Sequence, residues 1–356
     1  MWCTNVPSMA FSLLVSVLSG RCPPGVKRAI AFFPLIVFLS AFSTGCNQPQ
    51  TQTGPPEKIT IAYSTLPHTT VFHIAFLKGF LSAEGLEVKA NPFPFGKLAL
   101  DALLEGKADM ATQADTPVMF AITGGKKIYI IAQIASSSRS EAIVARKDRG
   151  IATPYDLKGK KIGVSLGTAN DFFMDSFLTT HGISRNEVKI VNMTLGEMAD
   201  AIIKGRVDAV STWVPFIQQV ENRLGNKGIT FYDEAIFHEP LCLTASQEFV
   251  KHHPEAVKKV LRALVRAEKF INENPEESRR LVSEFIKMDR TSVDQIFNLF
   301  DYKVILDQTL LVSLEDQAKW AIKNKLTRAR TIPNFIDFIY TDALKSVKSD
   351  AVRLIR

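Results

Sequence analysis

Two segments of the chain, 99 positions apart, share one order of residue types. They are Leu103–Met110 and Ile202–Ala209. Each reads as the apolar end of a helix, a Gly suited to a left-handed C-cap, a basic residue, and an Asp that opens a short strand. A polar loop and then a Pro follow each strand. The repeat predicts two similarly built lobes, each of which offers a loop to a shared cleft.

Strands and helices alternate through the middle of the chain, beginning with the strand-like run Lys58–Tyr63. The alternation predicts α/β layers with a largely parallel sheet, in which ligands bind beyond the carboxyl ends of the strands. We expect a first lobe in residues 57–140 and a second lobe in residues 141–234. Residues 235–356 should return to the first lobe and continue as a helical tail packed mainly on it.

The stretch Lys160–Phe177 joins a strand directly to a helix. Ile162–Leu166 reads as a buried strand, Gly167 permits a sharp turn, and Thr168 or Asn170 can cap the helix. Such a turn aims backbone N–H groups into a crevice, and helix N-termini favour anions by roughly 0.3–1 kcal/mol. The residues of this stretch alone fit an oxyanion-binding turn and an ordinary capped turn equally well.

The first 46 residues read as a leader. A basic pair precedes the apolar run Ala29–Phe42, and small residues precede Cys46. Small residues followed by Cys resemble the cleavage site of a bacterial lipoprotein, although Ser43 stands where that pattern usually has Leu. Lipidation of Cys46 would anchor the protein to a bacterial membrane, in the periplasm or at the cell surface.

Residues 47–56 contain no apolar side chain to bury, so we expect a flexible tether between the anchor and the first lobe. A first apolar stretch near Met1 is unusual for a leader. It is explained if translation starts near Val26 at an alternative start codon, and the sequence leaves both starts open.

Composition argues against several other classes of protein. The formal charge of +7 is spread along the chain, so we do not expect nucleic acid as a partner. Cleavage before Cys46 would leave Cys242 unpaired in an apolar strand, where a small core residue is favoured over a nucleophile. The six His residues share no ligand spacing, and phosphate- and dinucleotide-binding Gly motifs are absent from the sequence. We therefore predict no metal, no cofactor and no enzymatic activity.

Several segments together carry a resemblance to one family. They are Ile59–Tyr63, Leu104–Asp109, Asp156–Val164, Gly167-Thr168 and Trp213–Pro215. In order and spacing they resemble the substrate-binding proteins of ABC importers in the nitrate, sulfonate and taurine group, which includes carriers of pyrimidine precursors of thiamine. The resemblance implies the α/β, hinged, two-lobe periplasmic-binding-protein type II fold. It also implies a monomeric protein that closes on a small solute and delivers it to permease and ATPase subunits.

The resemblance further implies which loops bind the solute. Their residues are Leu66, His68, Thr69, Thr70, Asp115, Thr116, Gly167, Thr168, Ala169, Asn170, Asp171 and Trp213, with Arg139 at the crossing between the lobes. Thr168 and the neighbouring amides would receive an anionic or carbonyl end of the solute. Trp213 would pack against its body, and His68 and Thr69 would close from the first lobe.

Four of these residues have structural alternatives. Trp213 could belong to a lobe core, and His68 could be an exposed loop residue. Asp115 could be the N-cap of the helix that contains Pro117. Arg139 could form a salt bridge across the hinge instead of touching the solute.

Asp115 and Asp171 argue against a purely anionic solute, because their negative charges would repel it. They would suit an amine, as in taurine, or a protonated heterocycle, and a zwitterion could place its anion at Thr168 and its amine at an Asp. Three other functions compete with sulfonate, taurine or nitrate import. They are carriage of a pyrimidine or another heterocycle, a sensory or chaperone-like binding role, and an enzyme resembling the pyrimidine synthase that uses its own His and bound iron.

Overall fold

The computed structural model describes residues 55–355. The expected leader, residues 1–46 with Cys46, lies outside the described residues, as does the expected tether up to residue 54. Within the described range, we find no helix with both the length and the hydrophobicity that crossing a bilayer requires.

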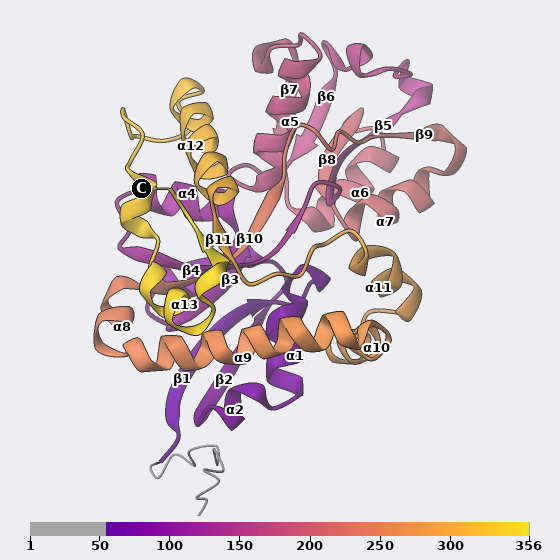
Figure 1. Cartoon of the computed structure of the whole chain (residues 1–356). Coiled ribbons are helices and arrows are strands. Elements are labelled where there is room, and N and C mark those ends of the chain that lie inside the picture. The colour runs from indigo at the N-terminus through magenta and orange to yellow at the C-terminus, as the bar shows by residue number, and fades with distance from the viewer. Residues whose placement is uncertain (1–54, 356) are drawn as a thin grey trace, which may run out of the picture. The chain divides into compact units, whose positions relative to one another are not determined.

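Two five-stranded sheets organise the described chain (Figure 1). The first has the order β2-β1-β3-β10-β4 and consists of β1 (Glu57–Ser64), β2 (Leu86–Phe93), β3 (Met110–Ala114), β4 (Ile128–Ser137) and β10 (Glu239–Ser246). The second has the order β7-β6-β8-β5-β9 and consists of β5 (Glu141–Arg146), β6 (Lys161–Val164), β7 (Lys189–Asn192), β8 (Ala209–Trp213) and β9 (Gly228–Phe231). We call each sheet with its helices a lobe, and number the lobes in the same order.

Each sheet is mixed but largely parallel, as predicted, because four of its five strands run in the same direction. In the first sheet β1 runs parallel to β2 and β3, whereas β10 is antiparallel to β3 and β4. In the second sheet β6 runs parallel to β7 and β8, whereas β5 is antiparallel to β8 and β9. β5 and β10 directly follow the two passages of the chain between the lobes, and we call them the crossing strands. Each enters its sheet from the other lobe and runs antiparallel to both of its neighbours.

Helices flank both sheets. They are α1 (Thr70–Leu77), α2 (Phe80–Ala83), α3 (Gly96–Leu104) and α4 (Asp115–Thr123) in the first lobe, and α5 (Ala169–Thr180), α6 (Leu195–Ile203) and α7 (Phe216–Leu224) in the second. α3, α4 and α7 each begin within three residues of the end of a parallel strand, and α5 begins five residues after the end of β6, so these helices follow the loops at the carboxyl edges of the sheets.

The repeated sequence segments form the same turn in both lobes. Gly106 and Gly205 have φ angles of 72° and 71°, which is the left-handed C-cap conformation that the sequence predicted. Asp109 Oδ2 accepts a hydrogen bond from a backbone N–H of β1 at 2.7 Å, and Asp208 Oδ2 accepts one from a backbone N–H of β6 at 2.9 Å. Each Asp thus ties the start of the third parallel strand to its neighbour, and the two lobes present equivalent loops.

After β10 the chain is mainly helical, as predicted (Figure 1). This tail consists of α8 (Gln247–His252), α9 (Pro254–Glu273), α10 (Pro275–Ile286), α11 (Arg290–Phe297), α12 (Gln308–Lys323) and α13 (Thr341–Val347), with a small ladder of β11 (Leu306–Asp307) and β12 (Val352–Arg353). Buried side chains recur along α9 at Val257, Val260, Leu261 and Leu264, and this face packs on α1 and α2. α12 packs on α4, so the tail lies mainly on the first lobe.

Candidate functional site

A pocket lies between the two lobes, beside the starts of the crossing strands. The space between its walls is about 500 Å³, with its open mouth included. The first lobe and the tail contribute His68, Phe95, Gly96, Lys97, Ala114, Pro117, Glu239 and Phe300, and the second lobe with its preceding passage contributes Ser140, Glu141, Thr168, Ala169, Trp213 and Val214. The pocket is lined mainly by apolar and aromatic side chains with a few polar groups, which is typical of a site for a small solute.

Aromatic rings from both lobes form part of the pocket wall. Phe95, just before α3, and Trp213, the last residue of β8, meet edge to face with ring centroids 6.4 Å apart. Phe300, from the segment after α11, lies beside His68 with ring centroids 6.2 Å apart. Trp213 is half-buried and borders the pocket, so it does not belong to a lobe core. The aromatic part of the pocket wall therefore contains rings from both lobes.

Two glutamates lie together in the pocket wall, and neither was predicted. Glu141 is the first residue of β5 and Glu239 is the first residue of β10, and their side chains are 5% and 7% exposed. Asn170 Nδ2 donates to Glu141 Oε2 at 2.6 Å, and Ser140 Oγ donates to Glu239 Oε2 at 2.9 Å. Burial and mutual repulsion raise the pKa of Glu141, and burial raises the pKa of Glu239. The interaction between the two carboxyl groups itself raises the pKa of Glu141 and lowers that of Glu239, so the two groups titrate as a pair.

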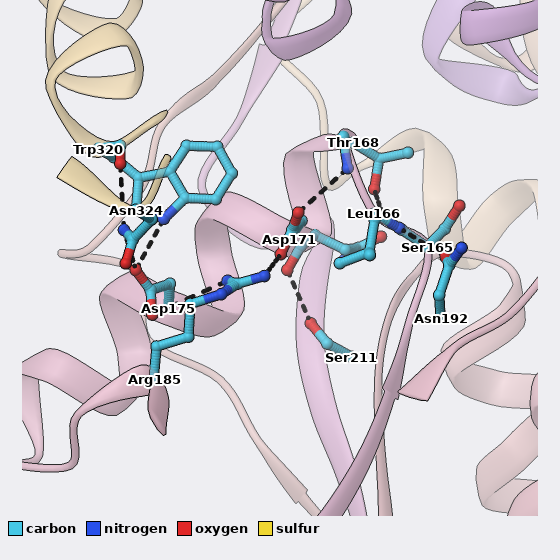
Figure 2. Close-up of polar contacts among 12 residues, drawn as sticks. Ser165, Leu166, Thr168, Asp171, Asp175, Arg185, Asn192, Ser211, Trp320 and Asn324 are labelled. Atoms are coloured by element: carbon cyan, nitrogen blue, oxygen red, sulfur yellow. Dashed lines mark hydrogen bonds and ion pairs between the residues drawn. The ribbon is translucent and has the colours of Figure 1, made fainter. Parts of the chain in front are cut away.

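The predicted turn before α5 reaches the pocket through Thr168 and Ala169. Gly167 has a φ angle of 73°, and Thr168 occupies the N-cap position in an extended conformation. The Thr168 hydroxyl donates to the carbonyl oxygen of Ser165 at 2.7 Å (Figure 2). The N-terminus of a twelve-residue helix therefore borders the pocket, where its dipole favours a negatively charged group.

Asp171 lies inside the second lobe and is 1% exposed. Its Oδ1 accepts from Arg185 Nη2 at 2.7 Å, and its Oδ2 accepts from the Gly167 N–H at 3.1 Å (Figure 2). Burial raises the pKa of Asp171, and the Arg185 guanidinium partly offsets that increase. Asp171 is thus engaged in holding the turn that carries Thr168, and it is not among the pocket-lining residues.

The same network links α5 to the tail. Asp175 Oδ2 accepts from Trp320 Nε1 of α12 at 2.7 Å and from Nδ2 of Asn324, the C-cap residue of α12, at 3.1 Å (Figure 2). The Trp320 ring also packs edge to face on Phe172 of α5 and Phe120 of α4, at centroid distances of 5.4 and 6.0 Å. These contacts join the second lobe to the first-lobe side of the molecule, and we call Asp175, Trp320 and Asn324 the latch.

Asp115 and Thr116 are fully buried at the start of α4 and are not among the pocket-lining residues. Ser313 Oγ and Gln317 Nε2 of α12 each donate to Asp115 Oδ2 at 2.6 Å. Burial raises the pKa of Asp115 to about 7, although these hydrogen bonds oppose the shift. The N-cap position belongs to Ala114, so the alternative interpretation of Asp115 as an N-cap was wrong.

Of the four residues predicted in the loop after β1, His68 borders the pocket. Leu66 is buried, and the hydroxyls of Thr69 and Thr70 donate to the carbonyl oxygens of Ser64 and Pro67, each at 2.6 Å. His68 Nε2 is buried without a hydrogen-bond partner. Burial, together with a smaller effect of the neighbouring His73, lowers the pKa of His68 to about 3, so the imidazole is neutral at physiological pH.

Arg139 lies in the passage between β4 and β5. Its Nε lies 3.1 Å from Glu234 Oε1, and Glu234 lies in the other passage, between β9 and β10. Both side chains are 60% exposed, so this ion pair adds little stability. The salt bridge across the hinge, which was the alternative interpretation of Arg139, is therefore present.

The sequence contained a recognisable signal for two of the pocket-lining residues that were not predicted. Glu141 and Glu239 are each a single acid at the start of an otherwise apolar strand, and an acid in such a place indicates a functional site. Phe95 and Phe300 had no comparable signal, because their positions depend on how α3 and the tail pack. Cys242 is fully buried in β10, where burial raises the pKa of its thiol, as expected of a core residue. Residues 55–355 contain no group of three or more His, Cys, Asp or Glu side chains arranged to hold a metal ion.

Two lobes that exchange crossing strands around a pocket define the periplasmic-binding-protein type II fold, which confirms the predicted fold class. The crystal structure of the periplasmic aliphatic sulphonate binding protein SsuA from Escherichia coli matches with a TM-score of 0.70 at 18% identity, covering 81% of this chain and 99% of that one.

The model of the NMT1/THI5-like family matches residues 67–278, and the chain belongs to that family. A candidate binding protein of Brucella abortus is 28% identical over 231 residues, which are 64% of this chain and 70% of the relative. The taurine-binding periplasmic protein of Escherichia coli is 24% identical over 219 residues, which are 59% of this chain and 65% of the relative. The predicted resemblance to substrate-binding proteins of the sulfonate, taurine and nitrate importers is thereby confirmed.

Proposed function

We propose that this protein is the solute-binding component of an ABC import system. The observation that carries the proposal is the pocket itself, because its wall is shared between the two lobes and includes Trp213, Phe95 and the helix N-terminus at Thr168. A site divided in this way can be completed only when the lobes come together. Binding therefore becomes coupled to a conformational change that a permease can recognise.

The mechanism we infer is capture by hinge closure. Two short passages, residues 138–140 and 232–238, connect the lobes. A solute that contacts both walls binds the closed state better than the open state, and so shifts the population toward closure. Micromolar affinity needs about 8 kcal/mol. A few charge-assisted hydrogen bonds of roughly 1.5–3 kcal/mol each, with aromatic contacts of about 0.5–1.5 kcal/mol, can supply it.

We assign the direct solute contacts to the residues that border the pocket. From the predicted set these are His68, Thr168, Ala169 and Trp213, to which we add Phe95, Glu141, Glu239 and Phe300. The other predicted residues would act indirectly, since Asp171 holds the turn before α5 and Asp115 holds α12. An anionic or carbonyl end of the solute would lie at Thr168 and Ala169.

We further propose that the mature protein is extracytoplasmic and anchored through lipid on Cys46, with permease and ATPase subunits as its partners. The lipoprotein-like leader and the known location of the taurine-binding relative in the periplasm support this. Intact-mass analysis of membrane-bound protein would show a chain that begins at Cys46 with an added lipid mass. A soluble mature chain that retains residues before Cys46 would contradict the anchor.

Native mass spectrometry of the purified protein, followed by calorimetric titration of the solute recovered, tests the function. We expect one small molecule per chain and saturable binding. A panel of sulfonates, taurine, nitrate and aminopyrimidines would rank the solute classes. Chemical conversion of the solute during the titration would contradict a binding role and favour an enzyme.

A further inference from the structure

The pocket contains a carboxyl pair that spans the two lobes. Glu141 and Glu239 occupy equivalent places, since each is the first residue of a crossing strand that runs antiparallel to the third parallel strand of its sheet. One glutamate moves with the second sheet and the other with the first. Both line the pocket, and both are at least nine-tenths buried.

Among residues 55–355, neither glutamate forms an ion pair with a basic side chain. Lys97, at the pocket wall, is partly exposed and pairs with Asp101 Oδ2 at 3.0 Å. Arg139 pairs with Glu234 outside the pocket. Uncharged donors, Asn170 and Ser140, each bond one oxygen of the pair. No basic side chain in the described part of the chain therefore balances the charge of these two adjacent, buried acids. A proton or a group of a bound solute must neutralise them.

A second observation points to a ligand at the same place. His68 Nε2 is buried, has no hydrogen-bond partner and borders the pocket. A neutral imidazole can hydrogen-bond a solute without repelling a positive charge. The rings of Trp213, Phe95 and Phe300 add the kind of surface on which a cation is stabilised by its contact with aromatic faces.

The geometry points to the pair Glu141 and Glu239 as the subsite for a positively charged nitrogen group of the solute, either a protonated amine or an amidine-type group. The N–H groups donate to both carboxylates and take the place of the proton that the two acids share. That proton leaves for bulk water, so the solute keeps its charge and the pair becomes doubly ionised. This inference rests on the proposed solute-binding function and names the chemical class of the solute.

The subsite also explains how a solute could hold the lobes together. A cation that bonds both carboxylates is bound to both crossing strands, and its attraction to each acid is lost when the lobes separate. A solute that also carries an anion can place it at the α5 N-terminus, at Thr168 and Ala169. A plain sulfonate or nitrate would instead meet the carboxyl pair with nothing to offset its negative charge.

Exchange of a solute cation for a proton makes binding depend on pH. Affinity should rise with pH, by up to about tenfold per unit where the pair would otherwise hold its proton. The other titratable groups facing the pair are His68 and Lys97 in the pocket wall, and Asp115 and Cys242 behind Glu239. Asp115 adds negative potential when it ionises, which reinforces the same trend.

Matched probes test the inference on the complete mature protein. Benzamidine is compared with its neutral counterpart benzamide, and taurine with ethanesulfonate, by calorimetry in buffers of different ionisation enthalpy. We expect the nitrogen cation to bind at least about tenfold more tightly in one pair, as one charge-assisted hydrogen bond would provide, with release of about one proton. Equal affinity within both pairs, or no binding of any probe, would overturn the inference.

Separate variants Glu141→Gln and Glu239→Gln should each reduce the preference for the cationic probe by at least about tenfold. They should also abolish the proton release. Glu234→Gln, at the exposed hinge salt bridge, is the matched control and should leave the preference unchanged. Melting temperatures of all three variants report whether the fold is intact, and retained preference in both pocket variants would overturn the inference.

Failure of this inference is distinguishable from failure of the proposed function. A solute without a basic nitrogen that closes the lobes, with affinity unchanged in Glu141→Gln and Glu239→Gln, would overturn the subsite and leave solute binding intact. Probes that bind without moving the lobes would contradict capture by closure and leave the subsite intact.

Discussion

The two lobes begin their third parallel strand in the same way and end it differently. Asp109 and Asp208 form equivalent hydrogen bonds at the starts of β3 and β8. After β3, however, α4 starts at once with Asp115, which is buried and held by α12. β8, in contrast, ends with Trp213 at the pocket wall, and α7 begins three residues later. The shared turn builds a common scaffold, whereas the loop that follows decides whether a lobe supports the tail or contacts the solute.

The largest expected effect is loss of solute binding when the second-lobe loop is changed. Trp213→Ala should weaken binding by roughly a hundredfold, about 2.7 kcal/mol, because a central aromatic contact from one lobe is removed. Tyr155→Ala is the matched control, since Tyr155 is an aromatic residue of the same lobe that is 68% exposed and borders no part of the pocket. Titration of both variants with the recovered solute provides the measurement, and equal losses would contradict the role of Trp213.

The next prediction compares the loss of folding stability when a glycine in a close contact is replaced by Ala in each lobe. A Cβ on Gly96 of α3 would lie 2.6 Å from Gln113 Cα, whereas a Cβ on Gly163 of β6 would meet Met193 Sδ at 2.7 Å. A side chain can move aside more easily than backbone. We therefore expect Gly96→Ala to lower the free energy of unfolding by about 2–3 kcal/mol and Gly163→Ala by about 1 kcal/mol.

Urea unfolding of both glycine variants measures these losses. A larger loss for Gly163→Ala than for Gly96→Ala would show that β6 is less tolerant than the contact between α3 and β3. That result would contradict the expected order.

A smaller effect concerns the first-lobe loop and depends on pH. Asp115 has a folded pKa of about 7, above its unfolded value of 3.8, so unfolding releases its proton between those pH values. Its contribution to stability is therefore fully present below about pH 4 and is lost as the pH rises toward 7. In Asp115→Asn the amide oxygen can still accept from Ser313 and Gln317 without a titrating charge. We expect the stability of this variant relative to the wild-type protein to be greater at pH 7.5 than at pH 4, because only the wild-type protein loses the contribution of the protonated carboxyl between these pH values.

Thermal unfolding at the two pH values measures this difference. Asp101→Asn, on the surface of α3, is the control and should show no comparable change between them. A stability difference for Asp115→Asn that is the same at both pH values would contradict the buried, titrating carboxyl.

The smallest effect concerns the latch between α5 and α12. Trp320→Phe removes the N–H that donates to Asp175 and keeps most of the ring contact with Phe172 and Phe120. Loss of one hydrogen bond of about 0.5–1.5 kcal/mol should favour the open state and weaken solute binding by roughly threefold. Calorimetric titration beside Asp316→Asn, an exposed α12 control, tests this. Unchanged affinity would show that the latch does not distinguish open from closed states.

Much of the fold was predictable because its signals are local. In the repeat, the Gly residues that end the helices and the Asp residues that precede the strands depend mainly on their sequence neighbours. Both lobes therefore form the same turn. The direction of β5 and β10 was not predictable in this way. It depends on the chain crossing between lobes, so the alternation of strands and helices predicted largely parallel sheets but not the one reversed strand in each.

The residues of the candidate site can also be separated into those that local sequence indicates and those that depend on tertiary contacts. His68, Thr168 and Trp213 border the pocket between the lobes, because each lies at or soon after the end of a parallel strand. Asp115 and Asp171 follow strands too, yet partners within the fold occupy their carboxylates. The pairing of Glu141 with Glu239 depends on residues 98 positions apart meeting at the crossing, and no local pattern reports that meeting.

Lobe closure on solute is the central claim, and one distance measures it directly. Spin labels on cysteines introduced at Lys107 and Arg206, exposed and equivalent positions of the two repeated turns, would report the separation of the lobes. Addition of the recovered solute should shift the distance distribution to one narrower population in the wild-type protein and leave it unchanged in Trp213→Ala. A saturated wild-type protein whose distance distribution matches that of the solute-free protein would contradict capture by closure.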